Sequence, residues 1–324
     1  MANIVFIGGT GRCGTNILKN LFSKHPKVAT LPFEHRFLID PDGIVDFYST
    51  FSQSWSPFMA DKRLKRLENL LNEVSNDKIF HKALKKIIFL INKEGKFISP
   101  KKYIDWELTK YFPNFKKHNE KLVSKLREFT YRGIWPGTDS YTFKPQIYHS
   151  GPKTKEKLAE IFGNYLRDII QDFLLENNKE FFFEDNTWNI FFARELLELL
   201  PESKVIHIFR DPRDVVASFS QQRWCPGDRK KAALWYKSMM EYWFKIRNYL
   251  PSYFYYEIKL ETLVNSSEKS IRQLCEFTGL PFEDRLLEVN LGKSHIGRWE
   301  KEFPENEKME ISNILESVIY KLGY

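Results

Sequence analysis

A glycine-rich loop directly after the first strand constrains this 324-residue chain more than any other feature. The apolar run Ile4–Ile7 predicts a buried strand, and the glycines of residues 8–14 interrupt regular structure before a helix with apolar spacing begins. Strand, loop and helix in this order are typical of a parallel α/β sheet, and the N–H groups of such a loop can close on an anion. We therefore expect a phosphate-type cradle and a P-loop-like parallel sheet covered on both faces by helices.

This loop differs from the one that binds nucleoside triphosphates. In the pattern G-x-x-x-x-G-K-[ST], Gly9 and Gly14 fit the spacing, but Thr15 stands at the lysine position. Arg12, inside the loop, supplies the cation instead. A glycine-rich turn that binds nothing is the alternative. Cys13 has two interpretations, a low-pKa nucleophile at a helix end or, with no partner histidine indicated, a side chain that fills the loop.

A second motif follows a buried strand and runs over Arg210–Ser218. The strand delivers Arg210 to its C-terminal end, Asp211 can cap the helix that Pro212 begins, and Ser218 lies two turns further on. Arg210 and Ser218 can therefore converge on one anion. Asp211 can also be interpreted as a magnesium-binding acid, but the missing loop lysine favours the cap.

Together, the two motifs resemble those of the sulfotransferases that use 3′-phosphoadenosine 5′-phosphosulfate (PAPS). The resemblance covers residues 1–36 and about 181–300, and it implies sulfuryl transfer from PAPS to an acceptor hydroxyl without a metal ion. Arg12 would then stabilise the charge that develops during transfer. The residues implied to bind PAPS are Gly11, Arg12, Cys13, Gly14, Thr15 and Asn16 in the loop, Arg210 and Ser218 at the 3′-phosphate, and Gly297, Arg298 and Trp299 near the end of the chain.

The acceptor hydroxyl requires a base, and Glu34 is the first candidate. The sequence Glu34-His35-Arg36 resembles the Glu-x-Arg pattern of protein-tyrosine sulfotransferases, which implies Glu34 as the base and Arg36 as a substrate contact. His35, Asp185, Glu184 and a residue of the inserted segment are the alternatives for the base. His35 and Asp185 are also candidates for contact with the acceptor.

The chain departs from the family pattern directly after the predicted strand Phe181–Phe183. Many relatives have a lysine and a proline in the segment that is Glu184–Trp188 here, with Trp188 at the proline position. A transition-state lysine is therefore not assigned in this segment.

The segment Phe47–Ser150 lies outside the resemblance. Lys-rich amphipathic helices alternate there with aromatic loops, after a predicted loop at Pro32–Thr50. We expect a helical insertion at 47–150, within a single domain of residues 1–324, that forms much of the acceptor site. The aromatic residues that suit a glycan, or alternatively the core of the insertion, are Trp55, Trp106, Trp135 and Tyr148.

Beyond Thr154, apolar periodicity predicts a long helix and then an alternation of strands and helices. The expected strands are Phe181–Phe183, Lys204–Phe209 and Tyr253–Leu260. The expected helices are Ile190–Leu200, Pro212–Ser220, Ala232–Tyr249, Lys269–Phe277 and Met309–Leu322.

Charge and cysteine content limit the partners. Lys and Arg number 50 against 42 Asp and Glu, and the resulting charge of +8 favours anionic ligands. Three cysteines without CxxC spacing predict neither a disulfide framework nor a zinc site. No signal-type segment or apolar run of roughly 18 residues occurs, so we expect a cytoplasmic protein. The expected partner is a hydroxyl-bearing acceptor, with carbohydrate as one class and nucleic acid excluded. A P-loop kinase-like phosphotransferase and a non-catalytic nucleotide or polyanion binder are the alternatives.

Overall fold

The computed structural model forms two compact units. The residues that it describes are 2–75, 103, 106–136, 145–289, 291 and 295–324. The sheet unit contains residues 3–34 and 179–324, and the helical unit contains residues 35–178 together with Ala2. The predicted insertion at 47–150 falls within the residue range of the helical unit, and a single domain over 1–324 stays a prediction. No helix in the described ranges is both long and apolar enough to cross a membrane.

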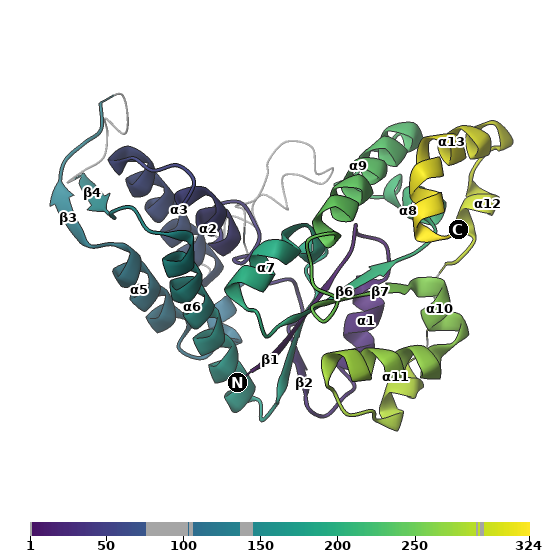
Figure 1. Cartoon of the computed structure of the whole chain (residues 1–324), viewed down its shortest axis with the longest axis horizontal. Helices are drawn as coiled ribbons and strands as arrows, with labels where there is room; N and C mark the ends of the chain where they lie inside the picture. Colours follow the sequence, from purple (N-terminus) through teal and green to yellow (C-terminus); the bar gives the residue numbers. More distant parts are fainter. Residues whose placement is uncertain (1, 76–102, 104–105, 137–144, 290, 292–294) are drawn as a thin grey trace, which may run out of the picture. The chain divides into compact units, whose positions relative to one another are not determined.

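A parallel sheet forms the centre of the sheet unit, with its described strands in the order β2-β5-β1-β6-β7 (Figure 1). The strands are β1 (Asn3–Gly8), β2 (Val28–Thr30), β5 (Phe181–Glu184), β6 (Lys204–Phe209) and β7 (Tyr255–Lys259). Almost every residue of β1, β5 and β6 is buried. Because successive residues of a strand point to opposite faces, both faces of the sheet are covered. The predicted fold class is confirmed.

Helices connect these strands and flank the sheet. They are α1 (Thr15–Phe22), α7 (Ala193–Leu199), α8 (Pro212–Phe219), α9 (Arg229–Arg247), α10 (Leu260–Asn265), α11 (Ser267–Thr278), α12 (Arg298–Glu302) and α13 (Glu305–Leu322), with short 3-10 helices η2 (Asn189–Phe192) and η3 (Asp284–Glu288). Helix α1 packs on β1 and β5, and α8, α9 and α13 pack against one another (Figure 1). Every strand and helix predicted beyond residue 180 is present, with ends shifted by a few residues.

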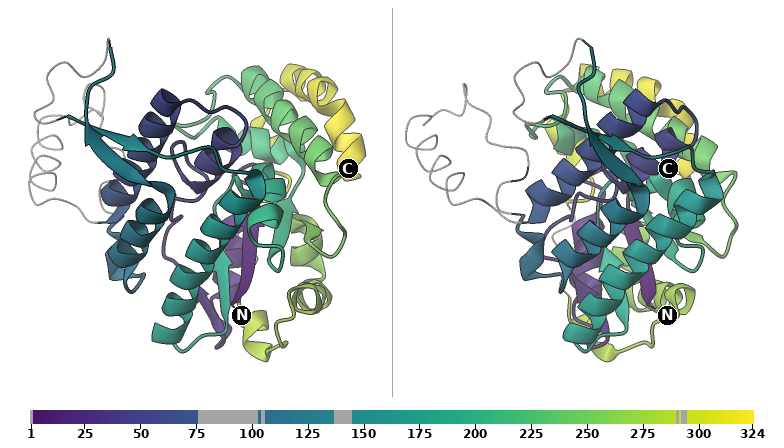
Figure 2. Two further views of the ribbon diagram at one scale, coloured as in Figure 1. Left: turned by 60° about the vertical axis from the view of Figure 1, so that its left-hand side comes forward. Right: turned by 90° about the vertical axis from the view of Figure 1, so that its left-hand side faces the viewer.

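The helical unit holds four described α-helices and a two-stranded hairpin. They are α2 (Ile44–Phe51), α3 (Pro57–Ser75), α5 (Phe115–Leu126), α6 (Lys155–Glu176), the 3-10 helix η1 (Leu108–Lys110) and the antiparallel strands β3 (Phe129–Arg132) and β4 (Gln146–His149). Helices α5 and α6 lie side by side in this unit (Figure 2). The predicted insertion also includes residues 76–102 and 137–144, which lie outside the described residues.

Two predictions for the helical unit were wrong. The predicted loop Pro32–Thr50 contains most of α2, whose apolar residues are buried at helical spacing. The segment predicted as helices and loops also contains the hairpin of β3 and β4. Each of these strands has only four residues, and the long connection between them gives no tight-turn signal.

The packing of β5 on α1 gives a test of the sheet core. Phe183 has 0% exposure, and its ring centroid lies 4.4 Å from that of Phe22. Phe183→Ala should lower the free energy of unfolding in urea by about 3–5 kcal/mol, because it leaves a cavity between helix and sheet. Leu234→Ala on α9, where the side chain is 55% exposed, is the control and should cost much less. Equal losses in the two variants would contradict this packing.

Candidate functional site

The C-terminal ends of all five strands meet at one edge of the sheet, because the strands are parallel. The glycine loop follows β1 in the middle of this edge, between the segment after β5 and the segment after β6. Glu34 follows β2 at one side of the sheet, and Glu261 follows β7 at the other. Ligand sites of open α/β sheets lie at this edge, so the topology assembles most of the predicted site residues in one place.

The glycine loop has the backbone conformation of an anion cradle. Gly11, Arg12 and Gly14 adopt positive φ angles of 87°, 57° and 114°. Gly14 precedes α1 without a side-chain cap, so the first N–H groups of this helix face the loop rather than a capping oxygen. The Gly9 N–H donates to the Thr187 carbonyl over 2.7 Å, which ties the loop to the segment after β5. This arrangement suits a phosphate or sulfate group.

Close packing explains the glycines at two positions. A Cβ atom at Gly9 would lie 2.2 Å from the Cys13 Sγ, and one at Gly11 would lie 2.6 Å from the Trp224 Cη2. Cys13 is buried, and burial raises the pKa of its thiol. A neutral, buried thiol is a poor nucleophile. The structure therefore favours the loop-filling interpretation of Cys13.

The second motif folds as expected around the start of α8. Asp211 caps the helix by accepting the Arg213 N–H over 2.9 Å, and Pro212 occupies its first turn. Arg210 is buried and donates from Nη2 to the Asp214 carbonyl over 2.6 Å. Burial lowers the pKa of its guanidinium, and the negative charge of Asp214 opposes this shift.

One hydrogen bond joins the two motifs. The Arg12 Nε donates to the Ser218 Oγ over 3.0 Å, across 206 residues of sequence. The cation of the glycine loop and the hydroxyl of the second motif therefore face the same small region. Thr15 is buried at the start of α1, and Asn16 is exposed.

The predicted residues near the end of the chain also reach α8. The N–H groups of Gly297 and Trp299 donate to the two carboxylate oxygens of Asp214, over 2.8 and 3.1 Å. Arg298 pairs with Glu302 over 2.7 Å, and its positive charge contributes to the lowered pKa of Arg210. Sequence reasoning gave Asp214 no role, because nothing in its position within the motif indicates a partner so far along the chain.

Glu34 lies beside the segment that follows β5. Its Oε1 accepts from the Thr187 hydroxyl over 3.2 Å and from the Thr187 N–H over 3.4 Å. Because the Thr187 carbonyl binds Gly9, a single residue connects the candidate base to the glycine loop. Asp185 pairs with Lys19 of α1 over 2.9 Å, a partner that sequence reasoning missed.

His35 and Arg36 belong to the helical unit, unlike Glu34. His35 is buried against the Phe37 ring, and burial lowers its pKa to about 3. An imidazole with this pKa is a weak proton acceptor at neutral pH, which disfavours His35 as the base. Arg36 pairs with Asp40 over 3.6 Å.

Glu184, another of the alternatives for the base, is buried at the end of β5. It accepts from the Asn186 N–H over 2.9 Å and from the Asn189 side chain. Burial raises its pKa to about 8, and the negative charges of Asp185 and Glu34 add to the shift. A carboxyl group that is protonated at neutral pH cannot serve as the initial proton acceptor, which disfavours Glu184.

Comparison with known proteins identifies the family. The sequence model described as "Sulfotransferase family" matches residues 4–284, which is most of the chain. The chain belongs to the sulfotransferase family. This membership supports sulfuryl transfer as the general reaction.

Solved sulfotransferase structures resemble the chain weakly over nearly its whole length. The sulfotransferase domain from the curacin biosynthetic pathway has a TM-score of 0.47 at 15% identity and covers 98% of each chain. The sulfotransferase domain of the Synechococcus PCC 7002 olefin synthase has a TM-score of 0.48 at 14% identity, covering 98% of this chain and 94% of its own. An uncharacterized protein of Aquifex aeolicus (strain VF5) is 32% identical over an alignment of 104 residues, which covers 29% of this chain and 13% of that protein.

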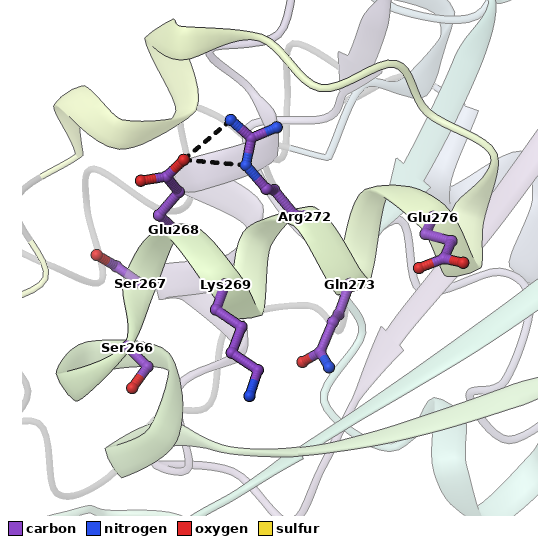
Figure 3. Close-up of a pocket in the computed structure, with 7 residues that line it drawn as sticks. All are labelled: Ser266, Ser267, Glu268, Lys269, Arg272, Gln273 and Glu276. Atoms are coloured by element: carbon purple, nitrogen blue, oxygen red, sulfur yellow. Dashed lines mark hydrogen bonds and ion pairs between the residues drawn. The ribbon is translucent and has the colours of Figure 1, made fainter.

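A shallow pocket over α11 lies apart from the predicted site. It contains the ion pair of Glu268 and Arg272, with 2.9 Å between Oε1 and Nη2 (Figure 3). It includes no predicted site residue of the sulfotransferase. Within the described residues, no group of three or more His, Cys, Asp or Glu side chains suits a metal ion.

The raised pKa of Glu184 predicts a pH-dependent stability. In the unfolded chain this group ionises near 4.5, and in the folded sulfotransferase only near 8. The folded state binds the extra proton between these values, so the stabilisation present below pH 4.5 is lost as pH rises towards 8. Relative to Glu184→Gln, the parent should lose roughly 2–4 kcal/mol of unfolding free energy between pH 5 and pH 8.

Urea denaturation of both proteins across this pH range is the measurement. Glu180→Gln, at the exposed residue directly before the same strand, is the control and should leave the pH dependence of the parent unchanged. Parallel stability curves for the parent and Glu184→Gln would show that Glu184 is ionised in the folded state.

Proposed function

We propose that this sulfotransferase moves a sulfuryl group from PAPS to a hydroxyl group of a carbohydrate acceptor. The hydrogen bond between Arg12 and Ser218 carries the proposal, because it brings the loop for the 5′-phosphosulfate and the motif for the 3′-phosphate to one ligand. A donor with phosphate at both ends of its ribose can contact both motifs at once. ATP lacks the 3′-phosphate and can satisfy only one.

The donor end of the site would act through hydrogen bonds and positive charge. Backbone N–H groups of residues 11–16, together with Arg12 and the Thr15 hydroxyl, would stabilise negative charge on the oxygen that leaves sulfur. Arg210, Ser218 and the segment Gly297–Trp299 would hold the 3′-phosphate. Charge-assisted hydrogen bonds of this kind give both affinity and orientation, which supports transfer without a metal ion.

Glu34 would act as the general base at the acceptor end. As the acceptor oxygen bonds to sulfur, its proton would pass to the Glu34 carboxylate, and the bond from sulfur to the bridging oxygen would break to release 3′,5′-diphosphoadenosine. Thr187 supports this role, because it holds Glu34 with two hydrogen bonds and the loop with a third. Asp185 is the alternative base, and its pairing with Lys19 makes it the weaker candidate.

Two exposed tryptophans of the sheet unit support a carbohydrate acceptor. Trp188 and Trp224 are 37% and 48% exposed, and their rings meet edge to face with centroids 6.5 Å apart. The Trp224 ring lies over Gly11 of the loop. Indole faces pack well on the C–H face of a sugar ring, although an aryl acceptor would also suit them. Sequence reasoning did not select these two residues.

The aromatic residues selected from the sequence lie in the helical unit. The Trp55 Nε1 donates to the Ser150 carbonyl over 2.9 Å. The buried Asp61 accepts from the Trp135 Nε1 over 3.0 Å and from the Tyr148 N–H over 2.8 Å. The two indole bonds explain Trp55 and Trp135 structurally, so these tryptophans give less support to acceptor binding. The bond at Tyr148 is made by its backbone, and the centroid of its ring lies 4.7 Å from the Arg127 guanidinium. A cytoplasmic location of the protein stays part of the proposal.

The donor proposal is tested by ligand-induced stabilisation. We expect 3′,5′-diphosphoadenosine to raise the melting temperature in the presence of a chelator, because protein groups supply both anion sites. ATP with magnesium should stabilise the protein much less. Stronger stabilisation by ATP with magnesium would favour the kinase-like phosphotransferase instead, and stabilisation by diphosphate without any turnover of PAPS would favour a non-catalytic binder.

A matched pair of serine variants, one on α8 and one at its C-cap, ties this binding to the site. Ser218→Ala removes a donor to the 3′-phosphate and should weaken diphosphate binding by about 10-fold or more in calorimetry. Ser220→Ala removes a hydroxyl that donates to the Ala217 carbonyl and should leave the affinity unchanged.

Glu34→Gln tests the base. The variant keeps the shape of the side chain but removes the proton acceptor, so single-turnover transfer from PAPS should slow by about 10²–10⁴-fold. The acceptor for this assay is the compound in a carbohydrate and aryl panel that gains the mass of one sulfuryl group. Diphosphate affinity should change little, since Glu34 lies at the other end of the site. Glu180→Gln is the control, and a Glu34→Gln rate close to that of the parent would move the base to Asp185.

A further inference from the structure

The first turn of α8 holds a segment that follows it by more than 80 residues. Asp214 is buried, and its Oδ2 and Oδ1 accept the N–H groups of Gly297 and Trp299. Both donors lie at the start of α12. One carboxylate therefore fixes two backbone positions of the segment that also carries Arg298.

A second side chain of the same turn holds Trp299 by its ring. The Arg213 guanidinium lies 4.0 Å from the centroid of the Trp299 ring, a cation–π contact. Two hydrogen bonds to Asp211, of 2.9 and 2.6 Å, fix this guanidinium in turn. Adjacent residues of α8 thus bind the backbone and the side chain of Trp299.

The conformation of Gly297 makes the carboxylate contact possible. Its φ of 73° lies in the left-handed region, where glycine is free of strain. A Cβ atom there would meet nothing within 4 Å, so backbone conformation and not space explains the glycine. The residue turns the chain so that its own N–H and that of Trp299 reach the same carboxylate.

The position of α8 connects this contact to ligand binding. Arg210 lies immediately before the helix and Ser218 at its end, with Arg213 and Asp214 between them. The charge of Arg298 acts on Arg210. Asp214 accepts from Arg210 through its backbone carbonyl and from Gly297 and Trp299 through its carboxylate. The segment that carries Arg298 is therefore held by the same residue that binds Arg210, which is proposed to hold the 3′-phosphate.

We propose that Asp214 is a positioning residue that anchors Gly297–Trp299 beside the 3′-phosphate site and thereby sets how long the bound nucleotide stays. The inference rests on the proposed use of PAPS. Asp214 would contact no ligand atom, and its effect would pass through the segment that it anchors. Release of the diphosphate would then require either loss of these two hydrogen bonds or movement of α12 together with α8.

The test is the dissociation rate of 3′,5′-diphosphoadenosine from the full-length protein. Asp214→Asn keeps the size of the side chain, but its amide group faces one of the two N–H donors. We expect dissociation to quicken by about 10- to 150-fold, the range for a lost hydrogen bond to a charged group, with little change in the association rate. Asp228→Asn is the matched control, because Asp228 caps α9 through the Lys231 N–H and lies outside the site.

Two further measurements keep the test decisive if Asp214→Asn folds poorly. Arg213→Met removes the ring contact together with the ion pair to Asp211, but leaves the two hydrogen bonds to Asp214 in place. It should quicken dissociation by about 2- to 5-fold, the range for a partly exposed cation–π pair. Trypsin should cut after Arg298 and Lys301 faster in Arg213→Met than in Asp228→Asn, even without ligand.

The outcomes separate this inference from the proposed function. A parent that does not bind the diphosphate overturns the use of PAPS and this inference with it. If the parent binds but both α8 variants release the diphosphate at the parental rate, Asp214 is a structural residue only. Lower thermal stability of Asp214→Asn with an unchanged dissociation rate would also overturn the inference.

Discussion

The parallel pairing of β1 with β5 on one side and β6 on the other is the constraint on which the candidate site depends. Phe6 is in register with Glu184, and Gly8 with His207, so the loops after these strands begin within a residue or two of the same level. To enter a parallel strand, the chain must leave the C-terminal edge of the sheet and return by a crossover connection to the edge where the strands begin. The glycine loop and its two neighbouring segments therefore meet without any long loop to bring them together.

This arrangement separates the two candidate bases from the arginines of the two anion motifs along one edge. Glu34 and Asp185 follow β2 and β5, whereas Arg12 and Arg210 follow β1 and β6. Burial keeps Glu184 protonated, which removes one negative charge from a region that already holds two carboxylates. The separation suits a reaction in which a proton moves towards one end of the edge and a negatively charged leaving group departs at the other.

The sequence predicted the strand ends better than the contacts made there. Apolar strands and a glycine loop carry strong local signals, so the sheet, the loop after β1 and the capped helix after β6 followed from residue patterns alone. The partners of Asp214, Glu34 and Asp185 come from distant segments, and no local pattern encodes them. The hairpin of β3 and β4 was not predicted for the same reason, because its short strands depend on pairing with each other.

The departure from the family pattern after β5 has a structural counterpart in α1. Asp185 occupies the segment where many relatives have a lysine, and Lys19 of α1 places an ammonium group 2.9 Å from its carboxylate. A positive charge is therefore still present at this strand end, but it comes from the helix that the glycine loop begins. Lys19 lies one turn beyond Thr15, so a single helical turn connects this cation to the end of the glycine loop. The sequence near β5 supplies carboxylates, and the cation beside them comes instead from the helix that follows the loop.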